Sequence, residues 1–248
     1  MPCISAIAVA LLAITLPARA DDPAPKEIVA KGLTASGLKD EGKETAFAFK
    51  DTGIVEVSGL KIEYKADFTF RPPDGLRFDM TAEVMGMKIA IKHVTAGDKV
   101  WEAMDGEAAE VKGEKADASK AQVYAFWVTS LKRLNHDKEF KLSNVVGKKV
   151  DNKETHGVLV EHKGKAEITL YFDKTSGLLV KSETQVKDEF QGWKEVLEES
   201  FYENYKESDG VKQAAKVRVV RDGKQLIESN PTDYQTIEKP DPKLFEKP

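Results

Sequence analysis

The stretch from residue 66 to residue 82, ADFTFRPPDGLRFDMTA, decides the fold. Before the turn Pro72-Pro73-Asp74-Gly75, apolar residues occupy every second position: Ala66, Phe68 and Phe70. After the turn the alternation resumes with Leu76, Phe78 and Met80. Two alternating runs joined by turn-forming residues are typical of a β-hairpin that has one apolar face and one polar face.

The same period of two extends over most of the chain. A second hairpin is predicted around Asp173-Lys174-Thr175-Ser176-Gly177, and further strands over residues 195–205, 211–220 and 224–228. Many alternating strands favour a mainly β (α+β) protein with a curved antiparallel sheet. No Pro/Ser/Gly-rich linker divides the chain, so residues 21–248 are predicted to form a single domain.

Two helices are predicted, one before the strands and one between them. Apolar residues at helical spacing (Val123, Trp127, Val128, Leu131 and Leu134) predict a long helix over residues 119–134, behind a candidate capping box that starts at Ser119. A short N-terminal helix is expected over residues 27–33. The polar stretch 106–120 is interpreted as an exposed loop, with a mobile lid as the alternative.

The first twenty residues read as a secretory signal. An apolar run, ISAIAVALLAITL, is followed by Ala18-Arg19-Ala20, which resembles a cleavage site, although no Lys or Arg precedes the run. We therefore expect cleavage near Ala20 and a periplasmic or secreted protein. Cleavage removes the single cysteine, Cys3, so the mature protein is expected to have no disulfide, no cysteine-based catalysis and no lipid anchor.

Composition and motifs exclude several functional classes. The 248 residues carry a net charge of −4, so the basic surface that nucleic-acid binding requires is not expected. The sequence contains no nucleotide-binding glycine pattern, no nucleophile elbow and no HExxH motif. The four His are scattered, and His156 and His162 are best explained as solvent-facing strand histidines. We expect no enzymatic activity, no cofactor and no metal.

The apolar face of a curved sheet is either packed against other side chains or open to a ligand. It packs as a dry core, or it leaves a cavity for an apolar ligand. The candidates for lining such a cavity are Phe68, Phe70, Leu76, Phe78, Met80, Phe126, Trp127 and Leu131. From the residues alone, both alternatives remain open.

The run 66–81 and the run GDKVWEAMDGEAAEV at 97–111 resemble the LolA/LolB-like superfamily, the periplasmic carriers and sorting proteins of outer-membrane lipoproteins. The predicted helix, the hairpin LYFDKTSGLLVKSE (170–183) and the tail from YENYK (202–206) to LFEKP (244–248) follow in the same order. The resemblance covers residues 25–248. The order of the elements is the informative part of the resemblance.

The resemblance implies a half-open barrel with a helical lid over an apolar cavity. It implies that the chain shields a lipid or a lipoprotein acyl chain, with membrane-bound donor and acceptor proteins as further partners. Arg71 matches the family's Arg-Pro arginine, which implies a role in holding the lid closed; Leu76 stands where the carriers tend to have an aromatic residue. Family members that are themselves lipoproteins have a Cys directly after the signal, which this chain lacks.

We therefore predict an exported lipid-binding protein with a lid formed by the helix at 119–134 and the loop that precedes it. The alternative is a protein-interaction or envelope-sensing module with the same fold and a dry core. With Trp127 in the lid, Trp127→Asp is expected to abolish ligand uptake and to leave the sheet folded.

Overall fold

The computed structural model describes residues 22–42 and 45–248. The expected signal peptide, residues 1–20, lies outside the described residues. The helical elements are α1 (Pro25–Ala35), α2 (Gly113–Thr129) and two short 3-10 turns, η1 (Glu189–Gln191) and η2 (Pro242–Phe245). No helix within the described ranges combines the length and the apolar character needed to cross a membrane.

Most of the described chain is strand. The strands are β1 (Ala46–Val57), β2 (Leu60–Arg71), β3 (Gly75–Val84), β4 (Met87–Ala96), β5 (Lys99–Met104), β6 (Glu107–Glu110), β7 (Phe140–Val145), β8 (Lys149–Val150), β9 (Lys153–His162), β10 (Ile168–Asp173), β11 (Leu179–Asp188), β12 (Lys194–Glu203), β13 (Lys206–Ser208), β14 (Val211–Gln213), β15 (Lys216–Arg221) and β16 (Lys224–Ile237).

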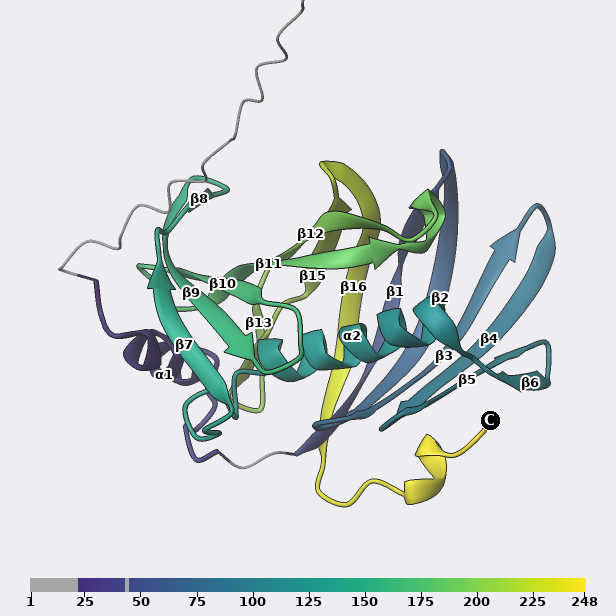
Figure 1. Cartoon of the computed structure of the whole chain (residues 1–248), viewed down its shortest axis with the longest axis horizontal. Helices are drawn as coiled ribbons and strands as arrows, with labels where there is room; N and C mark the ends of the chain where they lie inside the picture. Colours follow the sequence, from purple (N-terminus) through teal and green to yellow (C-terminus); the bar gives the residue numbers. More distant parts are fainter. Residues whose placement is uncertain (1–21, 43–44) are drawn as a thin grey trace, which may run out of the picture.

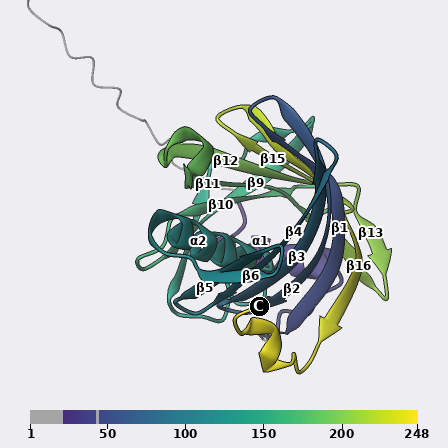
Figure 2. The same ribbon diagram turned by 90° about the vertical axis from the view of Figure 1, so that its right-hand side faces the viewer.

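One large antiparallel sheet contains all of these strands except the β13–β14 pair. Its order is β6-β5-β4-β3-β2-β1-β16-β15-β12-β11-β10-β9-β7, and β8 pairs with β9. The sheet begins at β6 and ends at β7, so it is not closed (Figure 1). Viewed along α2, it curls around that helix (Figure 2). The predicted curved antiparallel sheet with one long helix and a short N-terminal helix is confirmed.

The deciding hairpin forms as predicted. Phe70 pairs with Leu76 and Arg71 with Gly75, so the turn occupies residues 72–74. The second predicted hairpin is β10–β11, in which Phe172 pairs with Leu179. In both hairpins the alternating pattern sets the register, because a slip by one residue would move the apolar side chains to the polar face.

The last long strand joins the two halves of the sheet. β16 pairs with β15 on one side and with β1 on the other. Only its first five residues were predicted as strand. Its second half, over residues 230–237, is rich in polar residues, and its place in the sheet comes from pairing with β1. This long-range pairing makes one continuous sheet of the N-terminal and C-terminal strands.

The prediction of the long helix over 119–134 is wrong at both ends. α2 begins at Gly113 and ends at Thr129, and Ser119 lies inside it, where its hydroxyl donates to the Lys115 carbonyl four residues earlier (2.9 Å). The stretch 106–120 is therefore no loop, since it holds β6 and the first part of α2. The helix ends because the chain turns at Leu131, whose φ is +66°.

The main core lies at the end of the molecule where α1 packs. Val29 and Leu33 of α1 pack with Val128 of α2 and with the inner side chains of β9 and β10. This core accounts for the apolar spacing beyond the helix: Leu131 and Leu134 are buried in it, although neither is helical.

Candidate functional site

The inner face of the sheet, defined as the face on which α2 packs, carries rows of apolar side chains. Directly opposed residues on neighbouring strands point to the same face. The register places Phe49, Phe68, Phe78 and His93 in one row across β1 to β4. The rings touch along it: Phe49 stacks on Phe68 at a centroid distance of 4.8 Å, and Phe78 stacks on His93 at 4.9 Å.

The helix covers one part of the inner face. Phe126 of α2 lies with its ring centroid 5.9 Å from Phe70 and 6.4 Å from Phe68. Phe70 and Leu76 are fully buried beneath the helix, together with Val123. This part of the face is packed as a dry core.

The apolar rows continue toward the β1–β2 and β3–β4 turns. The next rows pair Asp51, Ala66, Met80 and Ile91, then Gly53, Tyr64, Ala82 and Ile89, with Val55 opposite Ile62. We call the apolar residues that are only half-buried there the distal inner face: Val55, Ile62, Met80, Ala82, Ile89 and Ile91. An apolar surface that is continuous with a core and still accessible to solvent suits an apolar ligand.

A buried carboxylate lies at the boundary between the two parts. Asp51 is 4% exposed and accepts hydrogen bonds from the Tyr64 hydroxyl (2.8 Å) and from the Ser229 hydroxyl (2.8 Å). Burial raises the pKa of Asp51, and these hydrogen bonds partly offset that rise. Because the donors come from β2 and β16, this polar contact ties three adjacent strands together.

Ion pairs attach the first turn of α2 to two different strands. Lys115 donates to Glu102 of β5 (2.9 Å), and Lys187 of β11 donates to Glu114 (2.8 Å). Beneath Glu102 lies the buried His93, whose Nδ1 is 3.8 Å from that carboxylate. The N-terminal end of the helix is therefore held by polar contacts, and its C-terminal end by the main core.

Burial lowers the pKa of His93 below its usual value of 6.5, although Glu102 acts in the opposite direction. In the unfolded chain the imidazole takes up a proton near pH 6.5, and in the folded chain only at lower pH. The unfolded state therefore binds more protons in this window, so the stability falls as the pH drops from about 6.5 toward the folded-state pKa. We expect His93→Gln to flatten this part of the profile.

Urea unfolding of the wild type and His93→Gln at a series of pH values checks this expectation. Parallel stability profiles below pH 6.5 would show that another group causes the acid sensitivity.

The predicted cavity residues lie in three places. Phe68, Phe70, Leu76, Phe126 and Trp127 come together in the cluster beneath α2, whereas Phe78 and Met80 lie further along the inner face, half-buried. Leu131 lies elsewhere: it follows the helix and is buried in the main core. Among the other candidates only Trp127 also contacts the main core, since it packs against both clusters. The role of all these residues toward a ligand stays a prediction.

Arg71 contacts the C-terminal turn. Its guanidinium lies over the ring of the buried Phe245 (4.2 Å to the centroid) and 3.5 Å from Asp74. Nearby, Arg77 donates to the Leu244 carbonyl (3.4 Å). These contacts attach η2 to the sheet, and the lid role of Arg71 implied by the resemblance stays a prediction.

Several inner-face residues were not among the predicted ones. Phe47 and Phe49 alternate within AFAFK (46–50), so the signal used for the deciding hairpin was available there. Ile89 and Ile91 also share one face of their strand, opposite Lys88 and Lys92. The involvement of His93, Asp51 and Ser229 has no local signal, because it depends on pairing between distant strands.

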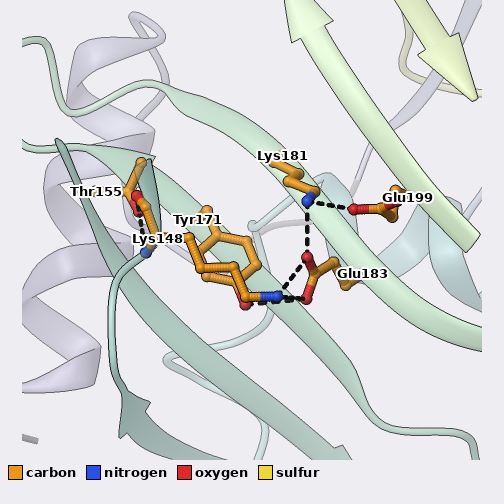
Figure 3. A network of polar contacts seen from close by, with 6 residues as sticks. All are labelled: Lys148, Thr155, Tyr171, Lys181, Glu183 and Glu199. Atoms are coloured by element: carbon orange, nitrogen blue, oxygen red, sulfur yellow. Dashed lines mark hydrogen bonds and ion pairs between the residues drawn. The ribbon is translucent and has the colours of Figure 1, made fainter. Parts of the chain in front are cut away.

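The outer face carries a separate polar network, drawn in Figure 3. The Lys181 ammonium lies between Glu183 (2.7 Å) and Glu199, and Glu183 also binds Lys148 (2.7 Å) and the Tyr171 hydroxyl (3.0 Å). Burial disfavours the charged form of Lys181, but its two carboxylate partners outweigh burial and raise its pKa. The network fastens the segment that precedes β8 to β10, β11 and β12.

Removal of the Lys181 ammonium is expected to destabilise the protein by about 3 kcal/mol, because it leaves two carboxylates on a largely buried site without their shared cation. The matched control is Lys141→Ala, which breaks an exposed pair with Glu161 (2.8 Å). That change is expected to cost less than about 1 kcal/mol. Chemical denaturation of Lys181→Ala and Lys141→Ala at neutral pH measures both, and equal losses would contradict the role assigned to Lys181.

A metal site does not emerge from this geometry. Within residues 22–42 and 45–248, no three His, Cys, Asp or Glu side chains are grouped so that they could hold a metal ion.

Comparison with known proteins identifies the fold. No protein-family model matches the sequence, and no curated protein matches it. Among solved structures, a LolA superfamily protein from Nitrosomonas europaea matches with a TM-score of 0.59 and 12% identity, over 91% of this chain and 99% of that chain. A putative outer membrane lipoprotein-sorting protein domain from Vibrio parahaemolyticus matches with a TM-score of 0.54 and 12% identity, over 89% and 95%.

A third similar structure is a DUF1329 family protein from Desulfovibrio piger, with a TM-score of 0.57 and 11% identity, over 91% of this chain and 98% of that chain. Each match extends over nearly the whole length of the similar protein, so the similarity concerns the complete fold. Because the sequence identities are low, the matches show a shared fold and do not show a shared function. Together with the curled sheet around α2, these matches show that the chain has the fold of the LolA superfamily.

Proposed function

We propose that the chain is a non-enzymatic carrier that binds the acyl chain of a lipid or lipoprotein on the distal inner face. The observation that supports this most directly is the set of half-buried apolar residues from Val55 to Ile91, which continue the core beyond the part covered by α2. Burying acyl carbons contributes about 0.8 kcal/mol per CH₂ group, so a chain laid along these rows binds usefully.

An apolar ligand suits the chemistry of the distal inner face. Apart from Asp51, which is already bound by Tyr64 and Ser229, the distal rows offer apolar side chains. Such a surface binds a ligand by burying apolar area, and because this interaction is non-directional it discriminates little between alkyl chains. We infer a ligand class defined by its alkyl chain, with the headgroup left toward solvent.

Periplasmic location and transfer toward the outer membrane belong to the same proposal. They are supported by the apolar N-terminal segment and by the fold shared with the Vibrio lipoprotein-sorting domain. Membrane-bound donor and acceptor proteins would be its partners.

Native mass spectrometry of the protein purified gently from an exporting host, together with lipid extraction, tests the proposal. We expect a co-purifying mass that is released as lipid. The stripped protein should then bind the fluorescent fatty acid cis-parinaric acid, with phospholipid as competitor. A clean apo mass without uptake of the probe would overturn the proposal and favour the protein-interaction module, for which the dry packing of Phe70 and Leu76 is the supporting observation.

A further inference from the structure

Exposed apolar side chains concentrate at one end of the sheet. The described residues include six large hydrophobic ones that are exposed, and five of them lie on or beside hairpin tips: Leu60, Met85, Met87, Met104 and Phe190. Met85 is the most exposed, at 83%. The sixth, Val146, lies in the β7–β8 connection.

These tips belong to neighbouring hairpins. The sheet order places β5–β6, β3–β4, β1–β2, β15–β16 and β11–β12 side by side, and their turns all lie at the same end of the strands. We call these tip segments, residues 56–61, 83–88, 104–107, 187–194 and 221–224, the rim. In Figure 1 the β1–β2, β15–β16 and β3–β4 turns stand along the upper side of the molecule.

The rim is continuous with the distal inner face. On β4 the inner side chains run from Ile91 through Ile89 to Met87, and on β2 from Ile62 to Leu60. An acyl chain that leaves the rim therefore meets apolar side chains all the way to the proposed site.

We propose that the rim docks on the surface of a lipid bilayer, so that an acyl chain passes between the bilayer and the inner face without crossing water. This inference rests on the proposed function. The rim side chains reach the bilayer from separate hairpins, and lysines stand next to them: Lys61 follows Leu60, and Lys88 follows Met87. Lysines in such positions extend toward headgroups while their neighbours enter the apolar layer.

The net charge of the rim predicts which lipid composition the protein binds. The rim contains six Lys and Arg against seven Asp and Glu, so it has almost no net charge. Docking should therefore depend on apolar insertion and hardly on anionic lipid. Vesicles of phosphatidylcholine alone should bind the protein about as well as vesicles that also contain phosphatidylglycerol.

Vesicle flotation tests the inference with the full mature chain. Wild type should float with phosphatidylcholine vesicles. The double variant Met85→Ser/Phe190→Ser removes two exposed apolar tips outside the inner face, and should partition at least about tenfold less. The control Val146→Ser changes a residue that is as exposed as Phe190 (52% and 51%) and lies away from the rim, and it should float like wild type.

The readouts separate this inference from the proposed function. Both variants should bind cis-parinaric acid in the absence of vesicles as wild type does. Wild type that binds the probe and does not float, or a double variant that floats undiminished, would overturn the docking inference alone. Flotation that requires phosphatidylglycerol would overturn the apolar mode of docking. If light scattering shows that the protein self-associates through the rim, the rim binds a second copy of the chain, which would overturn docking on a bilayer. If the wild-type protein does not bind cis-parinaric acid, the proposed function itself is overturned.

Discussion

Replacing Ile62 by Asp is expected to weaken binding of cis-parinaric acid at least about a hundredfold, because a bound acyl chain would bury an unpaired carboxylate, at a cost of several kcal/mol. Ile62 lies opposite Val55 on the distal inner face and is half-buried. A ligand seated there has to cover it. Fluorescence titration of the stripped protein measures the change.

The strand pair also provides the matched control. Ile54 precedes Val55 on β1 and pairs with Glu63, so its side chain points to the outer face. It is half-buried like Ile62, and Ile54→Asp places the same charge on the same hairpin. We expect Ile54→Asp to bind the probe like wild type. Equal binding by both variants, with native circular dichroism, would show that the ligand site is not the distal inner face.

The second large effect concerns Trp127, where the structure reverses the expectation from the sequence. Trp127→Asp is expected to unfold the protein, because Trp127 packs against both apolar clusters and its ring lies 4.8 Å from that of Phe140. Trp127 is half-buried between the two clusters. Loss of a large core side chain costs about 3–5 kcal/mol, and the desolvation of a carboxylate placed between the clusters adds to that. The total approaches the whole stability of an ordinary domain.

Thermal unfolding followed by circular dichroism checks the effect. Trp193→Asp is the control, since Trp193 stands in the β11–β12 tip with a φ of +65°, which Asp tolerates. It should melt close to wild type. A folded Trp127→Asp protein that has lost only probe binding would instead support the simple lid predicted from the sequence.

The alternating pattern was sufficient for the fold class and for the hairpins. In residues 66–82 each apolar side chain has one place in the register, so local chemistry determines both the strand pairing and the face that becomes apolar. The short helix and the long helix were also predicted, because their periodicity is local.

The helix boundaries were beyond sequence reasoning. Leu131 and Leu134 keep helical spacing, yet they are buried by a turn that carries them into the main core. Apolar spacing reports burial, and burial alone does not distinguish a helix from a turn that packs. The first turn of α2, which begins at Gly113, forms ion pairs with β5 and β11, and these partners lie outside the local sequence.

The sequence by itself therefore determined that apolar side chains line one face of a curved sheet, since a period of two is a property of each strand alone. Only the tertiary structure decided which part of that face is covered. Phe70 and Leu76 are dry beneath α2, whereas Ile62 and Ile89 remain accessible. The physical reason is that coverage depends on where α2 packs against strands that are distant in sequence, and such long-range contacts leave no period in the sequence.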